Sequence, residues 1–230
     1  KRLFCTCVEV LKWRFNMATV KFIADINDPL VKKEIEANYQ PSFLVENLFT
    51  EQDLNTMWHM AFIDSKPKLT GNQSIVTINR PMDIVYQAMK DKFDFLPGAE
   101  LSPTVGGNFF ISSCEYSVHT DSTMETNVGD STLEWLPWRN VLIPLWHNNN
   151  AGTFTTYKNR YADYAMTDTK YSVYNRSVFE NLEVENTWDW KPGNAFVFDT
   201  MQAHRSNMPT ENQYTLKGGL FLKFLRRRTK

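Results

Sequence analysis

The stretch WKPGNAFVFDTMQAHRSN, residues 190–207, carries the clearest indication of how this chain folds. It opens with a Pro-Gly turn, continues with a short apolar run and ends in a histidine, His204, followed by a polar segment. The next residues, MPTENQ, predict a turn into another strand. We therefore expect His204 at the end of a buried strand that belongs to an antiparallel sheet.

The same pattern of short strands and turns extends over the second half of the chain. Strand-forming runs separated by Gly, Pro and Asn turns recur from about residue 105, and no helical pattern alternates with them. Such a pattern predicts an antiparallel sandwich or barrel. The expected strands cover residues 106–119, 139–147, 152–157, 181–188, 194–200 and 214–224.

The first part of the chain is richer in helical patterns. Thr50 and Asp53 form a capping-box pattern at the start of TEQDLNTMWHMAF, residues 50–62. Two further helices are expected over residues 28–39 and 81–93, with a short strand at 73–80. The fold class is therefore mainly β with flanking α, in which the N-terminal helices back one sheet.

Bulk composition limits the classes of function. The 230 residues suit one domain, and 25 Lys and Arg against 26 Asp and Glu give no field that would attract nucleic acid or an anionic membrane. Three cysteines are too few for a disulfide framework, so we expect a reducing, cytoplasmic location. The apolar run near the N-terminus is short and charged, so we expect no membrane span. Residues 1–16 are interpreted as a leader or non-core segment, and residues 17–230 as one domain.

Two long segments between the predicted strands are candidates for function. Residues 122–138 and 158–180 exceed the usual length of loops in a compact domain. The second segment is rich in tyrosine, which argues against disorder, and we interpret it as a substrate lid or as a brace over the sheets.

Metal-ligating residues gather at two places. In an extended segment, residues two apart face the same side, so His119 and Asp121 of YSVHTDST can reach one point. His204 lies far along the chain at a strand end. Two histidines and one carboxylate form the facial triad that leaves open positions on Fe(II). Of the other histidines, His59 is interpreted as an ordinary core or surface residue of a helix, and His147 as either a loop residue or part of a cavity lining.

This arrangement of HxD, a distal histidine and a later cation resembles the Fe(II)/2-oxoglutarate-dependent dioxygenases. The resemblance covers roughly residues 100–224, and PSFLVENLFTEQDLNTM, residues 41–57, is similar to the N-terminal strand and helix of the prolyl-hydroxylase-like branch. It implies a double-stranded β-helix, or jelly roll, with His119, Asp121 and His204 as ligands of Fe(II). It also implies 2-oxoglutarate as cosubstrate, O2 as oxidant, and release of succinate and CO2.

A cosubstrate of this kind needs a cation for its far carboxylate. If the turn near residues 210–211 joins two antiparallel strands, position 204 lies opposite position 217, which favours Lys217. Arg205 should face the other way and stays a weaker candidate, while Lys223 lies on the order of 20 Å further along the strand. Arg226 is a fourth candidate.

Two further residues match the family near its cofactor. Tyr116 stands three positions before His119, and Thr153 lies in AGTFTTY, residues 151–157. Tyr116 is either a cosubstrate contact or a packing residue.

The predicted function is hydroxylation of a peptidyl, prolyl-type or small-molecule substrate. The alternatives are oxidation or demethylation of a nucleic-acid base by the same chemistry, and a non-catalytic cupin-like binding module. The near-neutral charge argues against nucleic acid, and the sequence indicates neither the substrate nor the oligomeric state.

Overall fold

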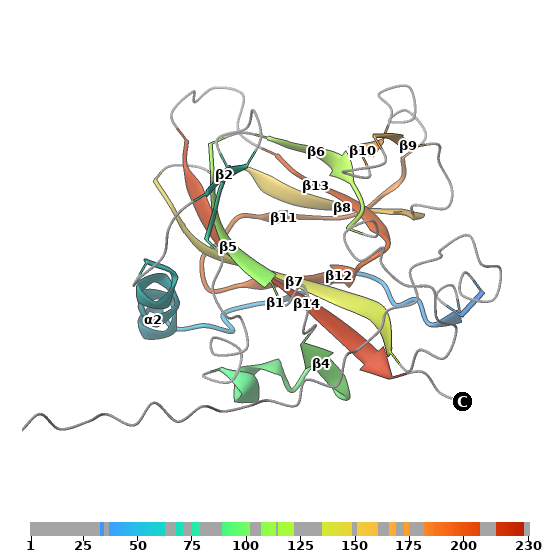
Figure 1. Ribbon diagram of the computed structural model, residues 1–230, viewed down its shortest axis with the longest axis horizontal. Helices are drawn as coiled ribbons and strands as arrows, with labels where there is room; N and C mark the ends of the chain where they lie inside the picture. The colour runs from blue at the N-terminus through green and yellow to red at the C-terminus, as the bar shows by residue number, and fades with distance from the viewer. Residues whose placement is uncertain are drawn as a thin grey trace, which may run out of the picture.

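The computed structural model describes residues 33–34, 37–62, 68–70, 75–78, 89–101, 107–113, 115–121, 135–148, 151–160, 166–168, 173–174, 182–207 and 215–227. Within these ranges the chain is mainly β and forms two antiparallel sheets that lie one above the other (Figure 1). The proposed leader, residues 1–16, lies outside the described residues. No helix in the described part of the chain has the length and apolar character that crossing a membrane requires.

The larger sheet contains most of the N-terminal strands and the long C-terminal strand. Its order is β1 (Phe43–Val45), β12 (Ala195–Asp199), β7 (Trp135–His147), β14 (Lys217–Arg227), β5 (Gly107–Ser112), β3 (Ile75–Ile78) and β2 (Lys68–Thr70), with β4 (Ala99–Leu101) also paired to β14.

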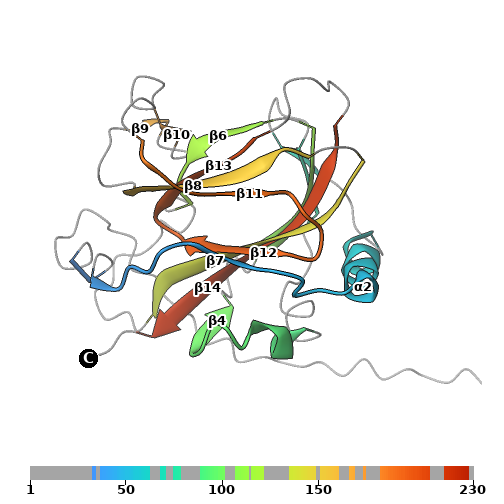
Figure 2. The ribbon, with the colours of Figure 1, turned by 180° about the vertical axis from the view of Figure 1, so that it is seen from behind.

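The smaller sheet is assembled from strands that lie between those of the larger one in sequence. Its order is β11 (Val184–Asp189), β8 (Thr153–Arg160), β13 (Gln202–Ser206), β6 (Tyr116–His119), β10 (Val173–Tyr174) and β9 (Met166–Asp168). The consecutive strands β12, β13 and β14 therefore alternate between the two sheets, which is visible from both sides (Figures 1 and 2).

Aromatic side chains fill the space between the sheets. Phe154 of β8 stacks on Phe196 of β12, with ring centroids 5.3 Å apart and an interplanar angle of 4°. Trp188 of β11 stacks on the same Phe196 at 5.5 Å. Every residue of β12 is buried because one of its faces meets this interior and the other meets a second apolar cluster. This double burial explains the nearly continuous apolar run at residues 195–198.

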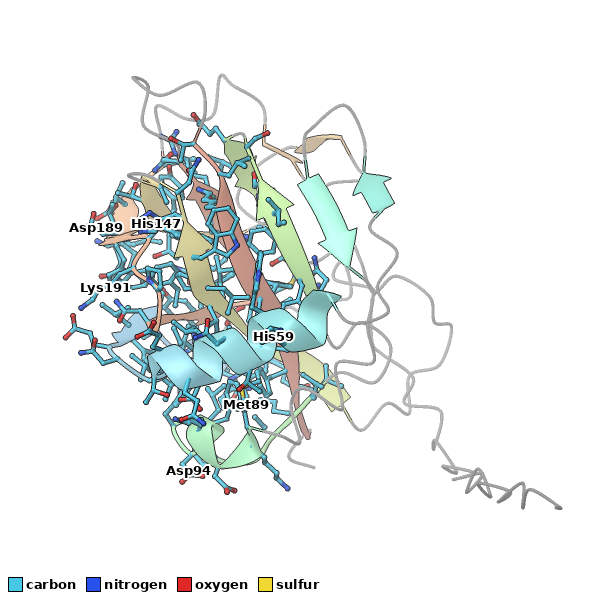
Figure 3. The ribbon with its side chains drawn as sticks, turned by 90° about the vertical axis from the view of Figure 1, so that its left-hand side faces the viewer. His59, Met89, Asp94, His147, Asp189 and Lys191 are labelled. Carbon is cyan, nitrogen blue, oxygen red and sulfur yellow. The ribbon has the colours of Figure 1, made fainter. Side chains whose placement is uncertain are left out.

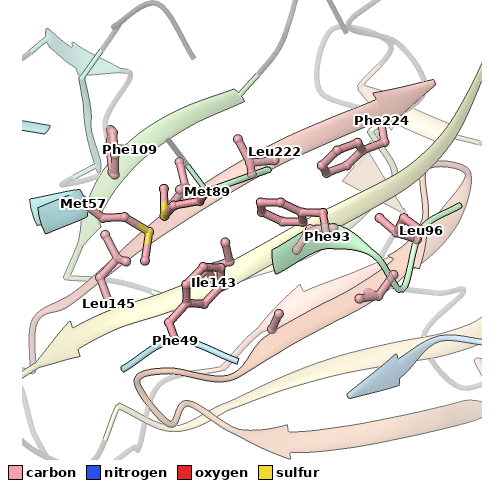
Figure 4. Packing of buried hydrophobic residues seen from close by; sticks show 14 residues of the cluster. Phe49, Met57, Met89, Phe93, Leu96, Phe109, Ile143, Leu145, Leu222 and Phe224 are labelled. Carbon is pink, nitrogen blue, oxygen red and sulfur yellow. The ribbon is translucent and has the colours of Figure 1, made fainter. Parts of the chain in front are cut away.

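The second cluster lies on the outer face of the larger sheet. Met57 of helix α2 (Glu51–Phe62) and Phe93 of the short 3-10 helix η1 (Lys90–Phe93) pack there against Ile143 of β7 and other apolar residues (Figure 4). Figure 3 shows α2 lying across the strands of this sheet.

The predicted capping box at the start of α2 is present. The Thr50 backbone N–H donates to Asp53 Oδ2 at 2.8 Å, and the Asp53 N–H donates to Thr50 Oγ1 at 3.2 Å. This reciprocal pair satisfies donors at the first turn of the helix.

Most of the predicted strands are confirmed where they are described. The strand predicted over residues 106–119 is instead two strands, β5 and β6, which lie in opposite sheets, and three further details differ. Residues 202–206 form a separate strand, β13, in the smaller sheet, so His204 does not lie at the end of β12. β13 pairs with β6 and β8 and not with β14, so the predicted hairpin that would place position 204 opposite 217 is wrong. The reason is that the consecutive strands β13 and β14 lie in opposite sheets of the sandwich.

The third difference concerns the two predicted long loops and the predicted helices. The segment 122–138 ends in the first residues of β7, while residues 122–134 lie outside the described part of the chain. The segment 158–180 contains the end of β8 and the short strands β9 and β10. Of the helical backing, α2 is described as a full helix, whereas most of the predicted helices at 28–39 and 81–93 lies outside the described residues.

Candidate metal centre

Three side chains that could ligate a metal meet in the smaller sheet. His119 ends β6, Asp121 follows two residues later, and His204 stands opposite His119 in the antiparallel register of β13 with β6. Asp121 Oδ1 lies 3.8 Å from His119 Nε2, and Asp121 Oδ2 lies 3.6 Å from His204 Nε2. The potential ligand atoms all lie within 4.8 Å of one another. Two ligands at about 2.0–2.2 Å from one ion lie at most about 4.4 Å apart, so one ion would bind all three after a small inward shift of these side chains.

Burial and charge favour the protonation states that a metal requires. Burial raises the pKa of the Asp121 carboxyl, but the positive charges near it, with those of His204 and Lys223 the largest, and a hydrogen bond from Asn140 hold that pKa below its usual value. Burial lowers the pKa of His204 despite the neighbouring Asp121. A carboxylate and a neutral imidazole are the forms that bind divalent metals. The donor set therefore fits a metal ion.

Hydrogen bonds fix the orientation of two of these side chains. The Nδ1 of His204 lies 3.0 Å from the carbonyl oxygen of Gln202, and a proton on Nδ1 would leave Nε2 as the ligand atom. Asn140 Nδ2 donates to Asp121 Oδ2 at 2.6 Å, and Thr200 Oγ1 donates to Asn140 Oδ1 at 3.1 Å. The Asp121 carboxylate is thus oriented by Asn140, which is itself oriented by Thr200.

Aromatic rings form a wall beside His204. The ring centroids of Phe198 and Phe154 lie 4.5 Å and 5.6 Å from that of His204. Both phenylalanines belong to the apolar cluster between the sheets. An apolar wall of this kind excludes water and strengthens electrostatic interactions at the site.

Lys217 reaches across the interior towards the strand that carries His204. Its side chain is 1 % exposed, and Nζ donates to Ser206 Oγ at 2.5 Å and to the Asn207 carbonyl at 3.0 Å. A longer contact of 3.4 Å goes to the Ala151 carbonyl, and Nζ lies 4.7 Å from the centre of the Trp190 ring. Lys217 therefore ends beside residues 206 and 207, two and three positions beyond His204, and it extends there from the opposite sheet and not through a hairpin.

The remaining predicted site residues lie elsewhere. Thr153 Oγ1 accepts from Asn207 Nδ2 at 2.9 Å, and strand alternation places Thr153 on the opposite face of β8 from Phe154, away from the triad. Arg205 faces away from His204, as predicted, and lies 3.7 Å from Glu115 at the surface. The backbone of Tyr116 pairs with Ser206, while its side chain lies outside the described part of the molecule.

Two residues of this site were not assigned a role from the sequence. Asn140 lies in β7 and Lys223 in β14, and each contacts Asp121 from the larger sheet. The strand period of two offers a signal, because positions 217, 219, 221 and 223 share one face. No local signal predicts which residue of the other sheet this face meets. His59 is exposed on helix α2, and His147 is exposed at the last position of strand β7 and not in a loop (Figure 3).

Comparison with known proteins identifies the fold. No protein-family model matches the chain, and no curated protein sequence does. Among solved structures, EvdO2 from Micromonospora carbonacea var. aurantiaca has a TM-score of 0.54 at 10 % identity, covering 88 % of this chain and 92 % of that one. HygX from Streptomyces hygroscopicus, solved with nickel and 2-oxoglutarate bound, has a TM-score of 0.54 at 10 % identity, with 86 % and 87 % covered.

A third solved structure is similar to the same extent. SnoN from nogalamycin biosynthesis, described as a non-heme alpha ketoglutarate dependent epimerase, has a TM-score of 0.51 at 9 % identity, covering 86 % of this chain and 84 % of that one. The chain therefore has the fold of 2-oxoglutarate-dependent non-heme oxygenases, a double-stranded β-helix. At the level of fold, the resemblance predicted from the sequence is confirmed.

Proposed function

We propose that this protein is an Fe(II)- and 2-oxoglutarate-dependent oxygenase that hydroxylates a C–H bond of a peptidyl, prolyl-type or small-molecule substrate. The observation that carries the proposal is the buried group of His119, Asp121 and His204, whose ligand atoms lie within 4.8 Å of one another. Two imidazoles and one carboxylate on one side of a metal are the ligand set of non-heme Fe(II) oxygenases.

Each residue has a role that follows from its contacts. His119, Asp121 and His204 would hold the metal, and the Gln202 carbonyl would fix the ring of His204 so that Nε2 faces it. Bound Fe(II) supplies the oxidative chemistry in which 2-oxoglutarate and O2 become succinate and CO2 while one oxygen atom enters the substrate. The protein orients the reactants and excludes water.

Lys217 is the proposed partner of the far carboxylate of 2-oxoglutarate. Its ammonium lies beside residues 206 and 207, which are two and three positions beyond His204 on the same strand segment. That offset is about 7–10 Å along an extended chain, which suits a five-carbon dicarboxylate chelating a metal at its other end. Arg205 faces the surface and is the weaker candidate.

The segment between β8 and β11 is the proposed substrate-contacting region. It includes β10, whose Val173 pairs with His119 at the edge of β6. A strand that lies directly beside a metal ligand is well placed to border the substrate. HygX and SnoN were solved with 2-oxoglutarate, and one SnoN structure also contains nogalamycin RO, which supports the small-molecule reading of the substrate.

The proposal is tested by anaerobic titration of the protein with Fe(II) and then 2-oxoglutarate, following the visible charge-transfer absorption of the chelate. We expect a band in the wild-type protein and none in His119→Ala. A wild-type protein without the band would contradict the cosubstrate, and a band that survives His119→Ala would contradict the ligand assignment.

A screen for succinate release then addresses the substrate. Peptides, free amino acids, small molecules and nucleic acids are compared, with the protein lacking added iron as the blank. Stimulation by a nucleic acid alone would favour the base-oxidation alternative. A protein that binds metal but releases no succinate with any substrate or alone would favour a binding module.

A further inference from the structure

A second buried lysine lies beside the proposed metal ligands. Lys223 is 1 % exposed, and its Nζ donates to the carbonyl oxygen of Asp121 at 3.1 Å. Among the residues that the structure describes, this is its one hydrogen bond, and no carboxylate oxygen lies within ion-pair distance of it. An ammonium has three N–H donors, so two of them have no partner in the described part of the protein.

This situation is costly for an ordinary core residue. A buried charge needs an opposite charge or a full set of hydrogen bonds, because it has lost its hydration. The Asp121 carboxylate interacts electrostatically with Lys223 but accepts no hydrogen bond from it, and the ring of Phe221, 6.0 Å from Nζ, supplies little compensation. The two remaining donors of Lys223 therefore call for an acceptor, and an anion would also compensate the charge.

The position of Lys223 indicates where that anion lies. Lys217, Gly219, Phe221 and Lys223 alternate along the face of β14 that is turned towards the smaller sheet. The ammonium of Lys217 ends beside Ser206, beyond His204, whereas the ammonium of Lys223 ends at Asp121. The two cations thus flank the triad from opposite sides.

Gly219 lies between the two lysines along β14 and lets aromatic rings pack closely against the strand. A Cβ at this position would lie 2.6 Å from the ring of Phe110 and 3.2 Å from that of Trp190. A larger residue would therefore push against aromatic rings that line the interior next to Lys217.

We propose that Lys223 is a second carboxylate-binding cation, which donates to the keto-acid end of the cosubstrate while Lys217 binds the far carboxylate. This inference rests on the proposed function. Lys223 would bind both the cosubstrate carboxylate and the backbone carbonyl of Asp121. Its ammonium would then compensate two negative charges next to the metal, those of the cosubstrate carboxylate and of the Asp121 side chain. The pair of lysines would then select a dianionic 2-oxo acid of fixed length.

The test compares two ligands on the metal-loaded protein without oxygen. 2-Oxoglutarate carries both carboxylates, whereas pyruvate has the keto-acid end alone. Dissociation constants are measured by calorimetry at saturating Co(II) for the wild type, Lys217→Met, Lys223→Met and the surface control Lys158→Met, and the affinity for Co(II) itself is measured separately.

The two lysine variants should give different patterns. Lys223→Met should weaken both ligands by about ten- to a hundredfold, the loss expected for one charge-assisted hydrogen bond. Lys217→Met should weaken 2-oxoglutarate to a similar degree and leave pyruvate within about threefold, a difference too small for a lost hydrogen bond. The control should match the wild type with both ligands, because Lys158 is exposed in β8.

Other outcomes would overturn the inference. If Lys223→Met weakens Co(II) but binds both ligands as the wild type does at saturating metal, Lys223 only holds the Asp121 backbone. If it weakens 2-oxoglutarate and spares pyruvate, Lys223 belongs to the far carboxylate. Lys223→Gln, which keeps donors without the charge, provides the same comparison should the methionine variant not fold. A wild type that binds neither ligand would instead contradict the proposed function.

Discussion

Two carboxylates in this molecule are both held below their usual pKa, yet their surroundings differ. Glu185 of β11 accepts hydrogen bonds from Tyr39 Oη, from the Ser42 N–H at 2.8 Å, from Ser42 Oγ and from Gln202 Nε2 at 2.7 Å. Asp121 accepts from Asn140 and has its oxygens turned to two histidines.

The difference separates a structural carboxylate from one suited to ligation. The oxygens of Glu185 are occupied by donors from the N-terminal segment and from β13, so they tie distant parts of the chain together. Those of Asp121 are directed at the point where the two imidazole Nε2 atoms converge. A depressed pKa alone therefore does not identify a functional carboxylate, and the geometry of its acceptor positions does.

Replacing Asp121 should produce the largest effect. Asp121→Asn keeps the shape of the side chain but removes the charge that a divalent ion needs. We expect the affinity for Fe(II) or Co(II) to fall by at least about a hundredfold, because the loss exceeds that of a residue that merely orients a ligand. Calorimetric titration with Co(II) measures it, and wild-type affinity would show that Asp121 is not a ligand.

Removing the side chain that orients Asp121 should have the next largest effect. In Asn140→Ala the hydrogen bond of 2.6 Å to Asp121 Oδ2 is lost and the Thr200 hydroxyl loses its acceptor. The metal affinity should fall by about ten- to a hundredfold. The same Co(II) titration is used, with circular dichroism to verify the fold, and an unchanged affinity would mean that Asn140 has no part in the site.

Glu185→Gln should affect stability and spare the metal. The amide keeps the shape but leaves donors of Ser42, Tyr39 and Gln202 facing an NH2 group, so we expect a loss of about 1–2 kcal/mol after allowance for its half-buried position. Urea unfolding measures the loss. The matched control is Lys158→Met, an exposed change expected to stay within about 0.5 kcal/mol. A large loss of Co(II) affinity in Glu185→Gln would remove the distinction between the two carboxylates.

The pH dependence of stability should show the smallest effect. Burial raises the pKa of the Glu185 carboxyl, but the hydrogen bonds from Ser42, Tyr39 and Gln202 lower it more, so the pKa in the folded protein lies below the ordinary glutamate value of 4.5. Its stabilisation is then complete above about pH 4.5 and is lost as the pH falls through the folded pKa. Urea midpoints between pH 5 and 3 should fall less steeply in Glu185→Gln, and parallel curves would contradict this.

The sequence predicts local features well and contacts between sheets poorly. The apolar run before His204, the two-residue spacing of His119 and Asp121, and the capping box at Thr50 are local patterns, and each is found in the structure. The sheet to which β13 belongs depends on the turn at residues 200–201, which has no Gly or Pro to mark it. The sequence therefore predicts one continuous strand from residue 194 to His204, whereas the chain crosses from the larger to the smaller sheet at this turn.

Long-range polar contacts explain the other differences. Ser42 and Glu185 are 143 residues apart in sequence, and Lys223 and Asp121 are 102 apart. Neither pair has a spacing that strand or helix periodicity would reveal. The separation of about 20 Å along one strand predicts a remote Lys223, whereas its ammonium ends at the carbonyl oxygen of Asp121.

The distribution of the site over two sheets has a mechanical consequence. The three candidate metal ligands belong to the smaller sheet or follow directly from it, whereas Asn140, Lys217 and Lys223 belong to the larger one. Under the proposed function, a bound cosubstrate would contact residues of both sheets and would therefore oppose their separation. Binding would then raise the midpoint of thermal unfolding in proportion to the logarithm of ligand concentration. The folded protein would be most stable when the cosubstrate is bound.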